Sequence, residues 1–222
     1  MTHAANTLEE TAYFLDLTTT SSKPVILVGA ERLAPDSDSD GPGNLWDAIR
    51  VAIAPEAISN GVMVVMNGQI NVARDITITN TSQAETFRSP EFGELGVVDV
   101  QSVRFYRTPP RRRTIAVNSK TQLRNIDIVM SYAGADGGMI RSMLSDGAVQ
   151  GFVIARLGTG GVPALMFDAI KEARARGIPV VMTTRVPTGR VFLLSAMKGF
   201  ALTLKQIGCL LADNLDLEEY LQ

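Results

Sequence analysis

Histidine and cysteine, two side chains that enzymes often use as base and nucleophile, are rare in this sequence. The chain has one histidine, His3, and one cysteine, Cys209, which excludes most Ser-His-Asp and Cys-His arrangements unless His3 takes part. A polar segment offers Asp75, Thr77 and Thr79 at alternating positions. A hydroxyl becomes a nucleophile only when a neighbouring base or cation activates it. Because threonine and aspartate are also common turn formers, this pattern alone predicts no enzyme.

Two further patterns could bind ions. Asp36, Asp38 and Asp40 alternate as in a calcium loop, but the rest of the twelve-residue pattern is missing, so we expect no metal. Residues 156–163 form a glycine-rich link between a predicted strand and a predicted helix, where backbone amides could hold an anion. That link matches neither the dinucleotide fingerprint nor the Walker pattern, and a tight packing turn is the simpler interpretation. No cofactor is expected.

The composition is that of an ordinary globular protein. Apolar residues make up 45% of the 222 residues and charged residues 20%, which is enough to build a buried core. The formal net charge of −2 gives no basic field that would attract nucleic acid. No apolar run reaches the roughly 20 residues of a membrane span, and the first residues lack the regions of a signal peptide. We therefore expect a cytoplasmic protein with no nucleic-acid or membrane partner.

The first half of the sequence predicts helices mixed with strands. Helices are expected over residues 7–18 and 44–52, and strands over residues 24–29, 61–67, 69–73 and 103–107. Thr7 and Asn44 are suitable N-caps for the two helices. Asn67 and Gly68 predict a tight turn that joins two strands as a hairpin.

The second half alternates regularly between strands and helices. Strands are expected over residues 126–132, 151–155 and 179–183, and helices over residues 138–146, 162–176 and 203–215. This order predicts a parallel sheet with right-handed crossovers. Residues 108–124 contain prolines and arginines without hydrophobic periodicity and are interpreted as a linker. We therefore expect an α/β fold of two lobes, over residues 1–107 and 125–222, with parallel, doubly wound sheets.

Several sequence blocks then become recognisable. Residues 7–17 read Thr-Leu-Glu-Glu-Thr-Ala-Tyr-Phe-Leu-Asp-Leu, and residues 184–189 read Thr-Arg-Val-Pro-Thr-Gly. Further blocks follow one another in order, at residues 28–32, 40–45, 73–81, 89–96 and 132–136. Together they resemble the bacterial-type (type I/II) L-asparaginase family over nearly the whole chain.

This resemblance implies a fold, a reaction and a ligand. It implies an asparaginase-like fold whose first lobe is incomplete, because nothing in this sequence corresponds to the family's segment before Thr2. In the family, a threonine of that segment attacks the side-chain amide, and a second threonine, assisted by a lysine, handles protons. An aspartate beside the second threonine holds the amino group of the substrate. The implied ligand is a small amino acid, namely asparagine, glutamine or aspartate.

The family's catalytic positions are altered in this sequence. By the resemblance, the Thr-Asp pair falls on Ala5 and Asn6, and the lysine falls on Ile78. Ala5 has no hydroxyl, and Ile78 offers neither a base nor a cation. Asn6 has no negative charge that could pair with the ammonium group of an amino acid. We therefore expect no catalytic residue among these three, and only Asn6 and Ala30 as substrate-binding candidates. Gly134 stands where related enzymes often place an asparagine that reaches the neighbouring subunit's substrate.

Four interpretations remain open at this point. In the first, the chain is a family relative with little or no activity. In the second, it is a non-catalytic scaffold or subunit that pairs with an asparaginase-like partner. It could also be a fold repurposed for another small amide or amino acid, using His3 or the polar residues between 75 and 79, or a truncated gene model. Without the missing segment, the strands at residues 25–28 and 62–66 would have open faces or edges. We therefore expect either a partner chain that completes the sheet or a first lobe of marginal stability beside a sturdier second lobe. The family resemblance itself implies a homo-oligomer.

Overall fold

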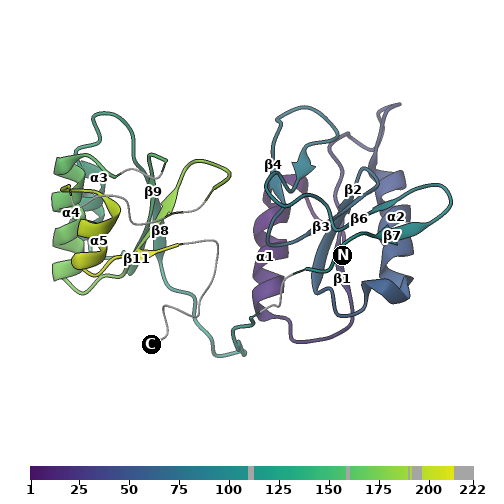
Figure 1. The fold of residues 1–222 in the computed structure, drawn as a ribbon, viewed down its shortest axis with the longest axis horizontal. Coiled ribbons are helices and arrows are strands. Elements are labelled where there is room, and N and C mark those ends of the chain that lie inside the picture. The colour runs from purple at the N-terminus through teal and green to yellow at the C-terminus, as the bar shows by residue number, and fades with distance from the viewer. Residues whose placement is uncertain (110–112, 159–160, 190, 192–196, 213–222) are drawn as a thin grey trace. The chain divides into compact units, whose positions relative to one another are not determined.

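The fold is described from a computed structural model of residues 1–222. The description covers the chain except residues 110–112, 159–160, 190, 192–196 and 213–222 (Figure 1). The chain divides into two compact units, Met1–Thr121 (unit 1) and Gln122–Gln222 (unit 2). Among the described residues, no helix has the length and apolar composition needed to cross a bilayer.

In unit 1, helices and strands alternate as far as β2, and only strands follow after it. Its elements are η1 (Ala5–Thr7), α1 (Leu8–Thr18), β1 (Val25–Leu27), α2 (Gly41–Ile53), η2 (Pro55–Ala57), β2 (Val62–Met66), β3 (Gln69–Val72), β4 (Thr77–Ile78), β5 (Phe87–Arg88), β6 (Gly96–Val98) and β7 (Val103–Phe105). The main sheet has the order β1-β2-β3-β6-β7. Only the β1–β2 pair in it is parallel, so this sheet is mixed rather than wholly parallel.

The predicted hairpin is confirmed. β2 and β3 pair as antiparallel neighbours, with Met66 opposite Gln69. Asn67 and Gly68 between them have φ angles of 51° and 69°. These left-handed values are typical of the turn that matches the twist of two paired strands. The strand predicted over residues 103–107 is also confirmed as β7, which is the last strand in the sheet order.

Strand β2 lies at the centre of unit 1 and is buried along its whole length. Its alternate residues face different helices: Val62 and Val64 pack with Leu8 of α1, whereas Met63 and Val65 pack with the α2 side. Figure 1 shows α1 and α2 on opposite faces of the sheet. The expectation that residues 62–66 would have an open face is therefore wrong, because a helix covers each face and β1 and β3 flank the strand.

One of the two predicted helix caps of unit 1 is confirmed in position and the other is wrong. Thr7 is the N-cap residue of α1, although it also closes the 3-10 turn η1 and its side chain makes no cap bond. α2 begins at Gly41, three residues before Asn44, with a proline in its first turn. Asn44 is buried inside the helix, and its amide bonds to neighbouring loops instead of the helix end.

Unit 2 has the alternating order that the sequence predicts. Its elements are β8 (Ile126–Met130), α3 (Gly138–Asp146), β9 (Gly151–Arg156), α4 (Ala164–Ala175), β10 (Val180–Thr184), α5 (Ala201–Gln206) and β11 (Leu210–Leu211). The four strands pair in the order β11-β10-β9-β8, and every pair is parallel. α5 is shorter than predicted, because Gly208, with φ 86°, turns the chain into β11. Residues 213–215 of the predicted helix lie outside the described residues.

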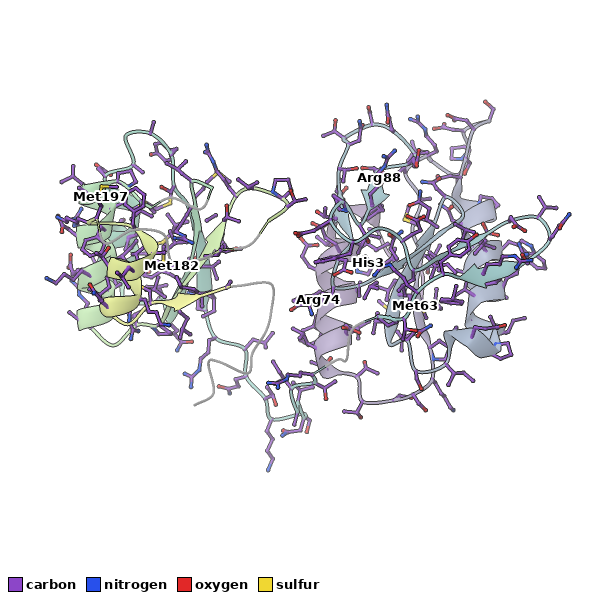
Figure 2. The ribbon with its side chains drawn as sticks, viewed as in Figure 1. His3, Met63, Arg74, Arg88, Met182 and Met197 are labelled. Carbon is purple, nitrogen blue, oxygen red and sulfur yellow. The ribbon has the colours of Figure 1, made fainter. Side chains whose placement is uncertain are left out.

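One continuous core holds unit 2 together. Phe152 and Ile154 of β9 and Met182 of β10 point to one face of the sheet and pack against α3 and α4 through Ile140 and Met166. Figure 2 labels Met182 in this core and Met63 in the core of unit 1. The described helices of unit 2 lie on that face of the sheet (Figure 1).

Candidate functional site

The candidate site lies where the parallel strands of unit 1 end. Ligands of α/β sheets bind beyond the carboxyl ends of such strands. Met1–His3 run beside the end of β1: the Val28 amide donates to the Met1 carbonyl at 3.1 Å, and the His3 amide donates to the Val28 carbonyl at 2.9 Å. A Cβ on Gly29 would lie only 3.1 Å from the His3 carbonyl oxygen. The segments at residues 4–6 and 29–30 therefore begin next to each other, at the same edge of the sheet.

The three altered catalytic positions come together at the start of α1. Ala5 and Asn6 belong to η1, directly before that helix. The amide of Ile78, on β4, donates a 2.8 Å hydrogen bond to the Glu9 carboxylate in the first turn of α1. Neither Ala5 nor Ile78 carries a group that can take up or release a proton. The structure thus places near the start of α1 the three residues on which the sequence resemblance puts the family's Thr-Asp pair and lysine.

Both ring nitrogens of His3, which Figure 2 labels, lie within hydrogen-bond distance of a partner. Its Nδ1 lies 2.7 Å from the Ala4 carbonyl oxygen, which can only accept, so Nδ1 carries the proton. Nε2 lies 2.9 Å from the Thr11 hydroxyl, which can form a hydrogen bond to it as donor or as acceptor. Both ring nitrogens therefore join residues 3–4 to α1, and His3 acts as a structural link.

The polar residues between 75 and 79 are also used in structural contacts. Asp75 lies between Arg74 and Arg107, at 3.8 and 3.9 Å. Burial raises the pKa of Asp75, and the two arginines act in the opposite direction. The Thr79 hydroxyl donates to the Thr86 carbonyl at 2.7 Å, across the small β4–β5 sheet. These contacts favour a structural role for Asp75 and Thr79 over a replacement catalytic one.

The loop that carries Ala30 is held by Asp40. The Asp40 carboxylate accepts from the amides of Glu31 and Arg32, with shortest distances of 3.1 and 2.9 Å. Asp38 pairs instead with the Arg32 side chain at 3.3 Å. In the described part of the chain, no group of three His, Cys, Asp or Glu side chains could hold a metal. Of the alternating aspartates, Asp40 therefore orders the loop that carries Ala30, through hydrogen bonds to the backbone.

Asn44 is the hydrogen-bonding centre of this region, and sequence reasoning missed it. Its side-chain amide donates to the Gly29 carbonyl at 3.2 Å and to the Asp40 carboxylate at 2.9 Å. Its oxygen accepts from the Asn67 amide at 2.9 Å. Asn44 therefore ties the loop after β1 to the turn after β2. A polar residue on the apolar face of a predicted helix was the available signal.

Comparison with known proteins identifies the class. A family model described as "Asparaginase, N-terminal" matches residues 1–111, and one described as "Glutaminase/Asparaginase C-terminal domain" matches residues 125–221. This chain therefore belongs to the bacterial-type asparaginase family, as the sequence blocks indicated.

Individual relatives agree with this membership. The chain is 40% identical over 193 residues to the "Probable L-asparaginase periplasmic" of Haemophilus influenzae and 39% identical over 193 residues to "L-asparaginase 2" of Escherichia coli. Each alignment covers 85% of this chain and 55% of the relative, so the chain spans about half the length of these curated relatives. A crystal structure of a probable cytoplasmic L-asparaginase from Campylobacter jejuni superposes with a TM-score of 0.85 at 35% identity, covering 94% of this chain and 67% of that one.

Proposed function

We propose that this chain is an asparaginase-family protein with little or no amide-hydrolase activity of its own. The supporting observation is that Ala5 and Asn6 directly precede α1, and that the Ile78 amide bonds to Glu9 in the first turn of the same helix. These three residues lack a hydroxyl, a charge and a base, respectively. The neighbouring residues that match the family, Asp40 and Asn44, make the hydrogen bonds that keep the two loops in place. The fold of the site is kept, and its proton-transfer groups are replaced.

The expected loss of rate is large. Removing one general acid or base costs roughly 10²–10⁴-fold. Ala5 and Ile78 replace two groups that act on the same proton in the family mechanism, so their effects need not multiply. With both groups replaced, no side chain is left to move that proton, so we expect essentially no hydrolysis by the family mechanism.

Hydrolysis of L-asparagine and L-glutamine, followed by proton NMR with the purified chain, tests this proposal. We expect the asparagine and glutamine resonances to persist over a day at the level of a protein-free control. Aspartate or glutamate signals that grow in proportion to protein concentration would contradict the proposal. The L-asparaginase 2 of Escherichia coli serves as the positive control for the assay.

The proposed ligand of the site is a small amino acid, held weakly. Asn6 stands where the family's aspartate holds the amino group, and a neutral amide binds an ammonium group less well than a carboxylate does. Asn6→Asp should therefore tighten binding of L-asparagine about fivefold to tenfold, equivalent to about 1 kcal/mol. Isothermal titration of both proteins measures this change.

Gln101→Glu is the matched control for added charge, because Gln101 is exposed in the turn between β6 and β7. We expect it to leave the affinity unchanged. An equal gain from Gln101→Glu, or no gain from Asn6→Asp, would remove Asn6 from the binding site.

A further inference from the structure

The sequence contains two Asn-Gly pairs, and the structure places them in different surroundings. Asn60 and Gly61 are both buried, and the Asn60 side-chain amide donates to the Glu56 carbonyl oxygen at 2.9 Å. Asn67 and Gly68 form the turn between β2 and β3 and are half-buried. The two pairs therefore share the same chemistry and differ in their access to water.

An asparagine that precedes glycine can react with its own main chain. The glycine nitrogen attacks the side-chain carbon Cγ, so that a bond from Cγ to this nitrogen forms and the bond from Cγ to Nδ2 breaks. Nδ2 leaves as ammonia and takes with it the proton of the glycine nitrogen. The resulting succinimide ring adds one water and opens to aspartate or to isoaspartate, whose main chain runs through Cγ. Glycine permits this attack because no side chain crowds its nitrogen.

The turn between β2 and β3 leaves the reacting atoms accessible. The Gly68 amide donates no hydrogen bond to any residue that the structure describes, so its nitrogen can attack. Solvent reaches both residues of the turn and supplies the water that opens the ring. One contact opposes the reaction, since the Asn67 side-chain amide donates to the Ala84 carbonyl oxygen. Breaking one such neutral hydrogen bond slows the attack by only about twofold to tenfold.

The buried pair is held by the sheet as well as by its own side chain. The Gly61 carbonyl accepts from the Val25 amide at 3.2 Å, and the Asn60 amide donates to the Ala57 carbonyl at 3.3 Å. Water reaches Asn60 only when these bonds and the buried start of β2 open together. We therefore expect Asn67 to react at least about ten times faster than Asn60 in the folded chain.

We propose that Asn67 is a modification site, which the folded chain converts spontaneously into aspartate and isoaspartate while Asn60 stays protected. Isoaspartate adds one carbon to the main chain of a two-residue turn, which then no longer matches the twist of β2 and β3. An ionised carboxylate has no proton to donate to the Ala84 carbonyl. The Asn67 amide also bonds to Asn44, so the modification loosens the contact between this turn and the loop after β1. The reaction needs no added amino acid and is independent of any amide-hydrolase activity.

Peptide mapping by mass spectrometry tests this proposal on the purified full chain. The chain is kept for several weeks in mildly alkaline buffer, once folded and once in guanidinium chloride, and both asparagines are followed. In the folded chain, modification of Asn67 should be at least about tenfold faster than that of Asn60. In denaturant, where both pairs are exposed, the two rates should agree within about twofold. Isoaspartate at position 67 identifies the route through the ring.

Gly68→Ala checks which nitrogen attacks, because the added methyl group crowds it. Gly68 has a φ of 69°, and a Cβ there would lie 3.0 Å from the Val98 carbonyl oxygen, so this variant is compared in denaturant, where its folding is irrelevant. We expect slower modification of Asn67 and an unchanged rate at Asn60. Equal rates at the two asparagines in the folded chain would overturn the proposal. So would an Asn67 that stays intact in the folded chain, or aspartate formed without isoaspartate.

Discussion

Replacing Asn44 by leucine is expected to lower the free energy of unfolding of unit 1 by about 3–5 kcal/mol. Leucine fills a similar volume but makes none of the three hydrogen bonds of the buried asparagine. The Gly29 carbonyl, the Asp40 carboxylate and the Asn67 amide would then each lose a partner. A buried group left without its hydrogen bond costs roughly 1–3 kcal/mol, which sets the size of the expected effect.

Urea unfolding followed by the fluorescence of Trp46 measures this change. Trp46 is the only tryptophan of the chain and lies on α2, two residues from Asn44, so its signal reports unit 1. Leu45→Asn, at the neighbouring and half-exposed position, is the control and should cost less than about 1 kcal/mol. An Asn44→Leu loss as small as that of the control would show that the hydrogen bonds of Asn44 do not hold the two loops.

Phe152→Ala is expected to destabilise unit 2 by about 3–5 kcal/mol and to leave unit 1 unaffected. Phe152 is 1% exposed and lies in the core between β9 and the helices of unit 2. Its removal leaves a cavity in a well-packed region, whose cost adds to the lost apolar burial. Because the chain forms two compact units, its unfolding need not follow a single transition.

Two probes of one urea titration separate the units. Far-ultraviolet circular dichroism, which records the helices and strands of both units, should show an early transition in the Phe152→Ala variant. The Trp46 fluorescence transition should keep its original midpoint. Val153→Ala, one residue along the same strand and on the opposite, partly exposed face, should change stability by about 1 kcal/mol or less. An equal shift of both probes would contradict independent unfolding of the units.

Local sequence signals were sufficient for the strands of unit 2 and for the β2–β3 hairpin. Short apolar runs followed by periodic helices predicted β8, β9 and β10 to within about two residues, which is the usual uncertainty of such boundaries. Asn67 and Gly68 predicted the hairpin because few other residue pairs adopt its backbone angles. The positions of Ala5, Asn6 and Ile78 came from spacing within matched blocks, and their role in binding stays a prediction.

The missed features depend on residues far apart in the sequence. The Ile78 amide bonds to Glu9, 69 residues earlier, and the Asn67 amide bonds to Asn44, 23 residues earlier. Each acceptor also fits a local role at the start of a helix, Glu9 as an acidic residue of the first turn and Asn44 as a cap. The sequence pattern therefore gave no reason to expect their hydrogen bonds to distant residues. The mixed sheet of unit 1 was missed for the same reason, because strand order is not encoded in local periodicity.

The most direct test of the altered site is ammonia release under single-turnover conditions. The unaltered chain is used in excess over L-asparagine, so that even one slow reaction cycle per protein molecule is detected. We expect no ammonia above the protein-free control, because Ala5 and Ile78 cannot transfer a proton. Ammonia release that reaches one equivalent of substrate and accelerates with protein concentration would contradict it, and would require a reacting group other than those the family uses.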